Sequence, residues 1–234
     1  MRILLWDIDG TLIHSVKVGG YKEYTIPVLE EIFGTSGRLR EMRVSGMTDL
    51  QIVYEALSVE GISQADILAR TEVLVSRLTE EARRVTSNGV KFFEVLPGVR
   101  ETLQALADHP RYESGLVTGN IKPMAQLKME LVGLDQFFTL PGAFGDESHN
   151  RRDLPARAAE RIREHLQMDL APEQFIVIGD TPNDIDCAHH FGARAVAVGT
   201  GRFYSAEEIL MHNPDKFLPD LTDVDLVLKT LAEL

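Results

Sequence analysis

The chain has 234 residues, a length that suits either one large domain or a core with a modest insertion. Its composition, 44% hydrophobic and 26% charged, excludes a largely disordered chain. Its net charge of −12 argues against nucleic acid as a partner, because an acidic surface repels phosphate backbones. No stretch reaches the roughly 20 apolar residues that cross a bilayer, so no membrane partner is expected either.

The first element is an apolar run from Ile3 to Trp6, followed directly by Asp7-Ile8-Asp9-Gly10-Thr11-Leu12. We expect a strand that ends in a tight turn and directs Asp7 and Asp9 into one crevice, at the edge of the sheet where open α/β proteins bind ligands. Two neighbouring carboxylates suit a divalent cation, or a division of labour between a nucleophile and a proton carrier.

Residues 14–94 have the pattern of successive helices with no strand between them, and the helical stretches are 24–33, 48–57 and 64–84. The sequence therefore predicts an all-α unit inserted after the first strand. Gly19-Gly20 and residues 96–98 flank this unit and are expected to serve as hinges.

Within this unit, Ser45-Gly46-Met47-Thr48-Asp49 interrupts the helical pattern. We favour the interpretation that Thr48 or Asp49 caps the next helix over direct contact with a substrate. The nearby Arg43 is a candidate contact to a substrate anion.

From residue 96 onward, helices alternate with short apolar strands. The expected strands are 115–118, 137–140, 175–179 and 193–198, and the expected helices are 99–107, 123–132, 154–166, one running through residue 188, and a terminal one at 222–234. This alternation predicts a parallel sheet with helices on both faces. The predicted fold class is α/β, with a core of residues 1–13 and 95–234 and the helical unit of residues 14–94 between them.

Two of these later strands also end in polar residues. Gly115-Leu116-Val117 leads into Thr118-Gly119-Asn120, where a hydroxyl and the free amides of a helix start suit a phosphate group. The strand at 175–179 leads into Asp180, and Asp184 follows four residues later. These carboxylates suit Mg²⁺, which prefers oxygen ligands.

Together these segments resemble the motifs of the haloacid dehalogenase superfamily: residues 7–12 the first motif, Thr118 the second, and Gly179-Asp180-Thr181-Pro182-Asn183-Asp184 the fourth. The helical insertion is similar to the cap of the family's phosphoglycolate phosphatase-like branch. The resemblance implies a Rossmann-like core with a cap over the active site, Mg²⁺ dependence, and phosphoryl transfer through an aspartyl-phosphate intermediate.

The resemblance also implies a role for each site residue. Asp7 would be the nucleophile, and Asp9 would protonate the leaving alcohol and then activate the hydrolytic water. The Mg²⁺ ligands would be Asp7, the main-chain carbonyl of Asp9 and Asp180, with Asp184 holding a metal-bound water or a neighbouring cation site. The phosphate group would lie against Gly10, Thr11, Thr118, Gly119 and Asn120.

The family's third motif, usually a Lys before a helix, has no match, since Ser148-His149-Asn150-Arg151-Arg152-Asp153-Leu154-Pro155 contains no Lys. We expect Arg151 to take this catalytic role in preference to Arg152, because a guanidinium reaches two oxygens of a phosphoryl group or a carboxylate. Lys122 is the alternative.

The sequence thus predicts an enzyme, a Mg²⁺-dependent phosphatase for a small phosphorylated metabolite such as phosphoglycolate or a sugar phosphate. Asp9 disfavours a dehalogenase, since family dehalogenases generally lack that second Asp. The alternatives are a sugar-phosphate phosphomutase and a non-catalytic binding protein on the same fold. The single cysteine, Cys187, is expected to pack in a helix, and since one cysteine gives no support for an oxidising compartment, a cytoplasmic location is expected.

Overall fold

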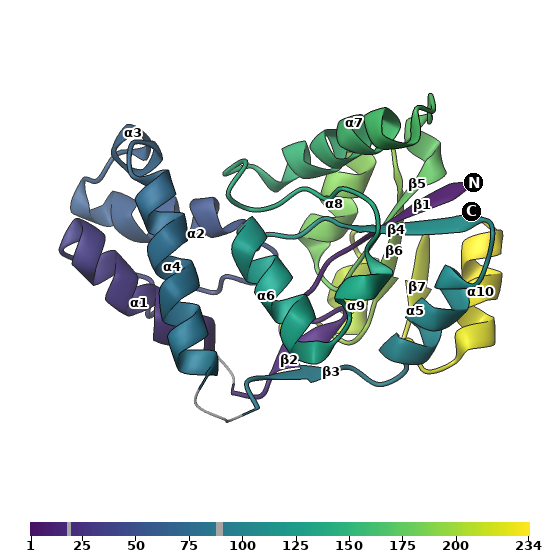
Figure 1. The fold of residues 1–234 in the computed structure, drawn as a ribbon, viewed down its shortest axis with the longest axis horizontal. Helices are drawn as coiled ribbons and strands as arrows, with labels where there is room; N and C mark the ends of the chain where they lie inside the picture. The colour runs from purple at the N-terminus through teal and green to yellow at the C-terminus, as the bar shows by residue number, and fades with distance from the viewer. Residues whose placement is uncertain (18–19, 88–90) are drawn as a thin grey trace.

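The computed structural model describes residues 1–17, 20–87 and 91–234 and has two lobes (Figure 1). One lobe is an α/β core that contains both chain termini. The other consists of helices and packs on the core at α6 (Lys122–Val132). Gly19 of the predicted hinge lies outside the described residues. None of the described helices contains the long apolar stretch that a membrane-spanning helix requires.

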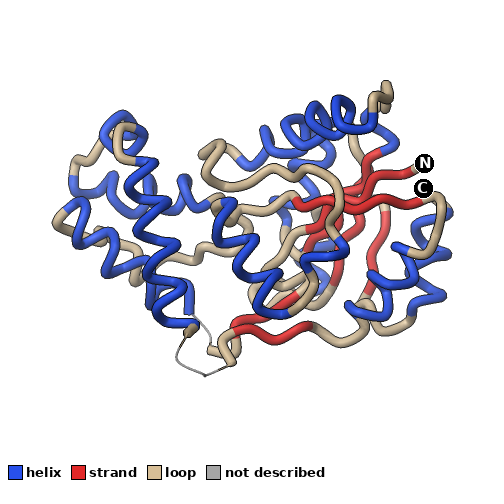
Figure 2. The backbone as a smooth tube through the Cα atoms, viewed as in Figure 1, coloured by secondary structure: helices blue, strands red, loops and turns tan. Residues whose placement is uncertain are grey.

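The core is built on a parallel sheet (Figure 2). Among the described residues this sheet has five strands, in the order β4 (Tyr112–Leu116), β1 (Arg2–Trp6), β5 (Phe175–Gly179), β6 (Arg194–Val198) and β7 (Lys216–Leu218). β1 lies between β4 and β5, with Leu5 opposite Gly115 on one side and Val177 on the other. The carboxyl ends of these three strands therefore meet at one edge of the sheet.

Alternate residues of β1 face opposite layers of helices. Leu4 and Trp6 pack in the layer of α5 (Val99–Ala107), α6 and α10 (Val224–Ala232). Ile3 and Leu5 pack in the layer of α7 (Leu154–Leu166), α8 (Pro182–Phe191) and the short α9 (Ala206–Leu210). This arrangement confirms the predicted α/β fold, a parallel sheet with helices on both faces.

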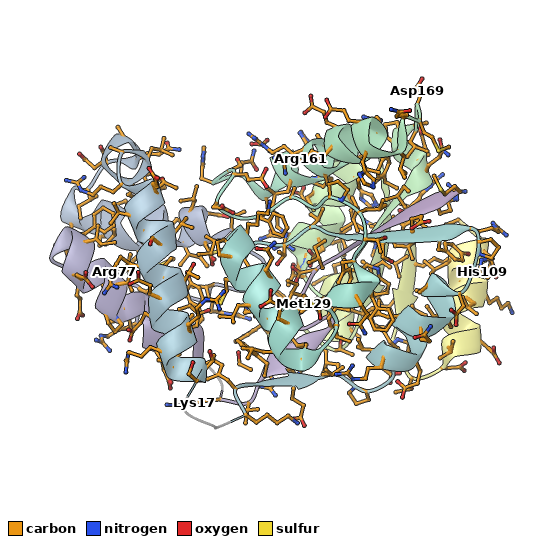
Figure 3. The ribbon with its side chains drawn as sticks, viewed as in Figure 1. Lys17, Arg77, His109, Met129, Arg161 and Asp169 are labelled. Carbon is orange, nitrogen blue, oxygen red and sulfur yellow. The ribbon has the colours of Figure 1, made fainter. Side chains whose placement is uncertain are left out.

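The helical lobe has its own apolar core. It consists of α1 (Gly20–Phe33), α2 (Asp49–Leu57), α3 (Gln64–Leu68) and α4 (Thr71–Thr86). Its buried side chains continue onto Ile121, Met124 and Leu127 at the start of α6. Towards the outside of the lobe, Arg77 of α4 donates to both carboxylate oxygens of Glu31 on α1, at 3.0 and 2.8 Å (Figure 3). The lobe is thus a packed unit that rests on the helix following Thr118.

Two short strands that the sequence did not indicate lie at the two ends of the predicted helical unit. β2 (Ile13–Ser15) pairs antiparallel with β3 (Phe93–Val95), and Ser15 lies opposite Phe93. Three residues are too few for an alternating pattern to be recognised. This ribbon connects the helical lobe to the core.

The helix expected over 64–84 is broken into α3 and α4. Arg70, between them, has φ −115° and ψ 7°, which lies outside the helical region. The strand β7 and the helix α9 were not expected, and the terminal helix α10 is shorter than the range 222–234. The 3₁₀ turns among the described residues are Ser58–Glu60, Asp135–Phe137, Arg151–Asp153 and Pro172–Gln174.

The prediction of a strand at 137–140 is wrong. Residues Asp135–Phe137 form a 3₁₀ turn, and the following chain then runs along the edge of β4 with isolated main-chain hydrogen bonds at Leu140 and Ala143. Pro141 lies between these two contacts and has no N–H to donate, so regular strand pairing is interrupted there.

Candidate active site

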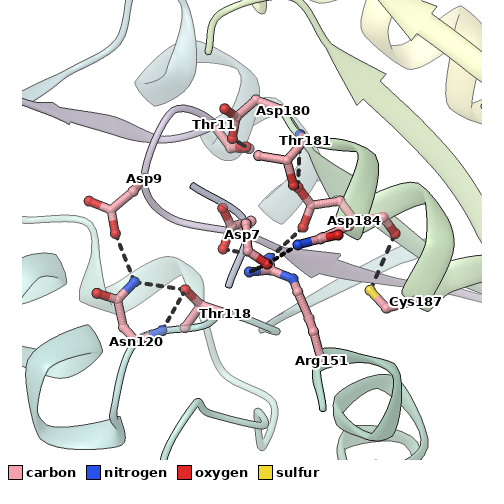
Figure 4. Close-up of polar contacts among 12 residues, drawn as sticks. Asp7, Asp9, Thr11, Thr118, Asn120, Arg151, Asp180, Thr181, Asp184 and Cys187 are labelled. Carbon is pink, nitrogen blue, oxygen red and sulfur yellow. Dashed lines mark hydrogen bonds and ion pairs between the residues drawn. The ribbon is translucent and has the colours of Figure 1, made fainter. Parts of the chain in front are cut away.

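Three buried carboxyl groups meet at the carboxyl edge of the sheet (Figure 4). Asp7 follows β1, Asp180 follows β5, and Asp184 lies in the first turn of α8. One oxygen from each of these three side chains lies within 4.8 Å of the other two. This separation suits three ligands of one metal ion.

The electrostatics of the cluster favour a positive charge at its centre. Burial raises the pKa of Asp7 to about 6; the Arg151 guanidinium opposes this, and the carboxylates of Asp184 and Asp9 add to it. Burial also raises the pKa of Asp180 well above its usual range, helped by the charges of Asp7 and Asp184. A bound cation relieves this repulsion and stabilises the ionised carboxylates.

Neighbouring hydroxyl groups and glycines fix the positions of these carboxylates. Thr11 Oγ1 donates to Asp180 Oδ1 at 3.1 Å, and Thr181 donates to Asp184 Oδ2 from its main-chain N at 3.0 Å and its Oγ1 at 2.6 Å. The latter pair forms the capping box of α8. Gly10 has φ +94° and lies so close to the Asp180 carboxylate that a Cβ atom would collide with it.

Arg151 contacts two of the three carboxylates of the cluster. Its Nη2 lies 3.0 Å from Asp7 Oδ1 and pairs also with Asp184 Oδ1, while only 6% of its side chain is exposed. Burial disfavours the charged guanidinium, but the carboxylates of Asp184 and Asp7 outweigh it, so the pKa of Arg151 is raised overall. Its Nε is buried and has no hydrogen-bond partner among the described residues. The guanidinium therefore stays charged beside Asp7 and retains a donor.

The other two cations considered for this role lie elsewhere. Arg152 points to the surface, where its Nε pairs with Asp186 at 2.6 Å. Lys122 is exposed, with its amine 5.9 Å from the centre of the Phe144 ring. The structure thus brings only Arg151, of these three described residues, to Asp7.

The Asp9 side chain points towards Asn120 and away from the three-acid cluster (Figure 4). Its Oδ2 accepts a hydrogen bond from Asn120 Nδ2 at 2.8 Å and forms an ion pair with Lys128 Nζ at 2.5 Å. Asn120 Nδ2 also donates to Thr118 Oγ1 at 2.8 Å. The sequence alone does not identify Lys128 as a site residue. The available signal is a charged residue at a position that helical spacing assigns to the apolar face of α6, four residues after Met124.

The helical lobe reaches this site through residues 45–49, the docking loop. The Gly46 carbonyl accepts hydrogen bonds from Asn183 Nδ2 at 2.7 Å and from Arg151 Nη1 at 3.3 Å. Asp49 N donates to the Gly119 carbonyl at 2.7 Å, and Asp49 Oδ2 accepts from Ile121 N at 2.8 Å. The docking loop is therefore hydrogen-bonded to both the β4 and the β5 ends of the site.

Thr48 in this loop caps α2, as the sequence predicts. Its Oγ1 accepts from Gln51 N at 3.1 Å. Arg43, considered as an anion contact, instead donates to the Phe203 carbonyl at 2.5 Å.

A pocket lies between the two lobes, and its empty space, including the part open to solvent, is about 940 Å³. The core contributes a charged floor and the helical lobe a wall of aromatic, apolar and acidic side chains; the floor includes Asp7, Asp9, Thr118, Lys128, Arg151 and Asp180, and the wall includes Tyr21, Tyr24, Met47, Asp49 and Ile52. Gly10, Gly119 and Asn120 also line it. Thr11 and Asp184 do not line the pocket: they are buried behind it and support Asp180 and Arg151.

A family model described as haloacid dehalogenase-like hydrolase matches residues 1–192. The chain belongs to this family. Known relatives of this hydrolase include a phosphoglycolate phosphatase of Photorhabdus laumondii, 26% identical over 96% of this chain and 91% of the relative. They also include a pyrophosphatase PpaX of Bacillus mycoides, 28% identical over 96% of this chain and 95% of the relative.

Solved structures share the fold of the hydrolase over its whole length. A hydrolase from Pseudomonas syringae superposes with a TM-score of 0.68 at 22% identity and covers 100% of this chain and 99% of its own. A putative beta-phosphoglucomutase from Thermotoga maritima superposes with a TM-score of 0.59 at 23% identity, covering 98% of this chain and 99% of its own.

The donor set of the hydrolase fits a hard divalent cation. The three acids offer oxygen ligands, and among the described residues no histidine or cysteine joins their cluster. Cys187 lies close by on α8 but is fully buried, and burial raises the pKa of its thiol to about 12. A thiol in that state is a packing group, as the sequence predicts, rather than a nucleophile.

Proposed function

We propose that this hydrolase is a Mg²⁺-dependent phosphatase that cleaves a small phosphorylated metabolite through an aspartyl-phosphate intermediate. The observation that carries the proposal is the surroundings of Asp7. Its carboxylate lies in the pocket beside two further carboxylates, of Asp180 and Asp184, and a buried guanidinium. The Thr118 hydroxyl is close enough to lower the pKa of Asp7. A nucleophile for phosphoryl transfer needs positive charge and hydrogen-bond donors on the phosphoryl oxygens, with its own oxygen free to attack in line.

In the proposed reaction, an Asp7 oxygen forms a bond to phosphorus while the bond from phosphorus to the leaving oxygen breaks. Asp9 gives that leaving oxygen a proton. A water then gives a proton to Asp9 and attacks the phosphorus of the aspartyl-phosphate, and the bond between phosphorus and the Asp7 oxygen breaks. This step releases phosphate and restores Asp7. Arg151 and Thr118 hold Asp7 in position and donate to the phosphoryl oxygens, together with the amides of Gly119 and Asn120.

Asp7, Asp180 and the main-chain carbonyl of Asp9 would hold the cation, and Asp184 would orient a water bound to it. Mg²⁺ bound there supplies charge that offsets the negative charge of the phosphoryl group. The choice of Mg²⁺ rests on the oxygen-only donors of the cluster.

The helical lobe, residues 14–94, is proposed to act as the cap that excludes water and selects the substrate. In the docking loop of this lobe, the Gly46 carbonyl accepts hydrogen bonds from Arg151 and Asn183. A movement of the lobe would therefore shift residues of the pocket floor. The relatives named phosphoglycolate phosphatase and pyrophosphatase support a small phosphate compound, such as phosphoglycolate or a sugar phosphate, as the substrate.

The test is hydrolysis of 4-nitrophenyl phosphate by wild type and Asp7→Asn, each with Mg²⁺ and with excess chelator. We expect release of phosphate that requires Mg²⁺ and falls by about 10³-fold or more in the variant, as is usual when a nucleophile is removed. Unchanged turnover in Asp7→Asn contradicts the proposal. Transfer of phosphate between sugar phosphates without release of phosphate identifies a phosphomutase, and metabolite binding without turnover identifies a binding protein.

A further inference from the structure

Lys128 is a buried charge at the floor of the pocket. It lies in the middle of α6, and 3% of the residue is exposed. Removal of an ammonium group from water is costly unless hydrogen bonds and an opposite charge compensate, and a methionine would fill this helix position without that cost. The presence of a lysine here calls for a role that needs its charge.

The Lys128 amine completes a closed set of contacts with two pocket residues. Its Nζ lies 2.5 Å from Asp9 Oδ2 and 2.6 Å from Asn120 Oδ1, and the Asn120 amide in turn donates to the same Asp9 oxygen at 2.8 Å. The amine also lies 5.4 Å from the centre of the Phe93 ring, which favours a cation. These contacts fix the position of the Lys128 amine, and its ion pair with Asp9 restricts the Asp9 carboxylate.

Asp9 needs such support because its own side chain is 42% exposed in the pocket. Both hydrogen-bond donors to its Oδ2 come from the segment that follows β4, and neither lies near Asp9 in the sequence. Without Lys128, a single neutral donor from Asn120 would remain, and the carboxylate could rotate about its side-chain bonds.

We infer that Lys128 is a positioning residue that fixes the Asp9 carboxylate in the floor of the pocket so that it faces the leaving group. This inference rests on the proposed function, in which Asp9 carries the proton for the leaving oxygen. Direct contact of Lys128 with a negatively charged part of the substrate is the competing role. Lys128 lines the pocket, but this role is disfavoured because only 4% of its side chain is exposed and its amine already has two oxygen partners.

The experiment compares kcat/KM for phosphate esters that differ in their need for a proton. Nitrophenolate leaves 4-nitrophenyl phosphate as a stable anion without a proton, whereas the alkoxide of benzyl phosphate requires one. 4-Carboxybenzyl phosphate adds a negative charge to the leaving group at nearly the same basicity. Since kcat/KM reports the steps up to the first irreversible one, it isolates formation of the aspartyl-phosphate from its hydrolysis.

We expect Lys128→Met to lower kcat/KM about 10²-fold for both benzyl esters, the usual contribution of a positioned general acid, and less than about threefold for 4-nitrophenyl phosphate. Asp9→Asn should give the same pattern with larger losses. A loss confined to the carboxybenzyl ester shows that Lys128 contacts the substrate, and overturns the inference. Equal losses with all three esters show a merely structural role, and overturn it as well.

Two controls separate these outcomes from misfolding and from failure of the proposed function. Lys122→Met removes an exposed lysine of the same helix and should leave all three values unchanged, and Lys128→Gln, which retains a neutral donor, should lie between wild type and Lys128→Met. Thermal unfolding of each variant establishes that it is folded. No turnover of any ester by wild type contradicts the phosphatase itself, a result distinct from a changed dependence on the leaving group.

Discussion

Asn183 of α8 donates a hydrogen bond of 2.7 Å from its Nδ2 to the main-chain carbonyl of Gly46, which belongs to the helical lobe. Arg151 donates to the same carbonyl while it pairs with Asp7. One peptide group of the docking loop is therefore connected to the helix that carries Asp184 and to the guanidinium beside the proposed nucleophile. Displacement of the loop should disturb the catalytic floor.

Substitution of Gly46 tests this connection. Gly46 has φ +78°, and a Cβ atom there would lie 2.7 Å from Thr181 Oγ1 and 3.0 Å from Asn183 Nδ2. Gly34 is a matched control, with φ +77° and no heavy atom within 4 Å of such a Cβ. Both Gly→Ala variants should lose about 1 kcal/mol of unfolding free energy from backbone strain, but only Gly46→Ala should also lower kcat/KM, by about tenfold as the loop shifts. Equal kinetics for the two variants would show that the docking loop is not coupled to the site.

Arg151 and Arg152 form a second matched pair, since they are adjacent in one 3₁₀ turn but face different surroundings. Arg151→Met should lower kcat about 10²- to 10³-fold, because it removes a preorganised charge from the phosphoryl oxygens. Arg152→Met removes an exposed ion pair with Asp186, and kcat should stay within about twofold. Steady-state kinetics with 4-nitrophenyl phosphate measure both, and similar losses in the two variants would refute the role assigned to Arg151.

Asp49→Asn should change the pH dependence of stability. Burial raises the pKa of Asp49 from 3.8 to about 6, although the Ile121 N–H and the charge of Lys128 oppose the rise. Between these values the folded state keeps a proton that the unfolded state releases, so the wild type loses stability as the pH rises, by about 3 kcal/mol over the whole window. This loss of stability is complete above the folded-state pKa. Asp49→Asn has no group that titrates at this position, so it does not lose stability in this way.

Urea unfolding at pH 5 and pH 8 measures this effect. The unfolding free energy of Asp49→Asn minus that of wild type should be about 1 kcal/mol larger at pH 8 than at pH 5, which means a more stable variant; the difference is less than about 3 kcal/mol because part of the window lies below pH 5. The Asn oxygen can still accept the Ile121 N–H. A relative stability that does not vary with pH would contradict the raised pKa.

Mg²⁺ should raise the thermal unfolding temperature of the wild type and leave that of Asp180→Asn unchanged. A ligand at 100 times its dissociation constant adds about 2.7 kcal/mol to the unfolding free energy. Without Mg²⁺, Asp180→Asn should be at least as stable as wild type at pH 7, because it removes a carboxyl group whose pKa burial raises well above its usual range. An undiminished Mg²⁺ shift in the variant would exclude Asp180 as a ligand.

The sequence predicts the parts of the site that follow strands. β1 and β5 are largely apolar, and β4 leads into the short apolar run 115–117. Polar residues follow all three, and parallel strands bring their carboxyl ends to one edge, so Asp7, Thr118 and Asp180 could be placed together. Lys128 could not, because its partner Asp9 is 119 residues away and a helical lysine is ordinarily solvated. For the docking loop the sequence predicts only a cap for α2, since its contacts with Gly119 and Asn183 depend on how the two lobes pack.

The ribbon of β2 and β3 brings the two ends of the helical lobe together. Because Ser15 pairs with Phe93, the chain leaves the core and re-enters it on neighbouring strands. A hairpin turn of about two residues is enough to join strands paired in this way. The proposed cap is therefore joined to the core through one paired ribbon, and a change in its length or sequence should alter the ligands that it admits without displacing β1 or the acids that follow it.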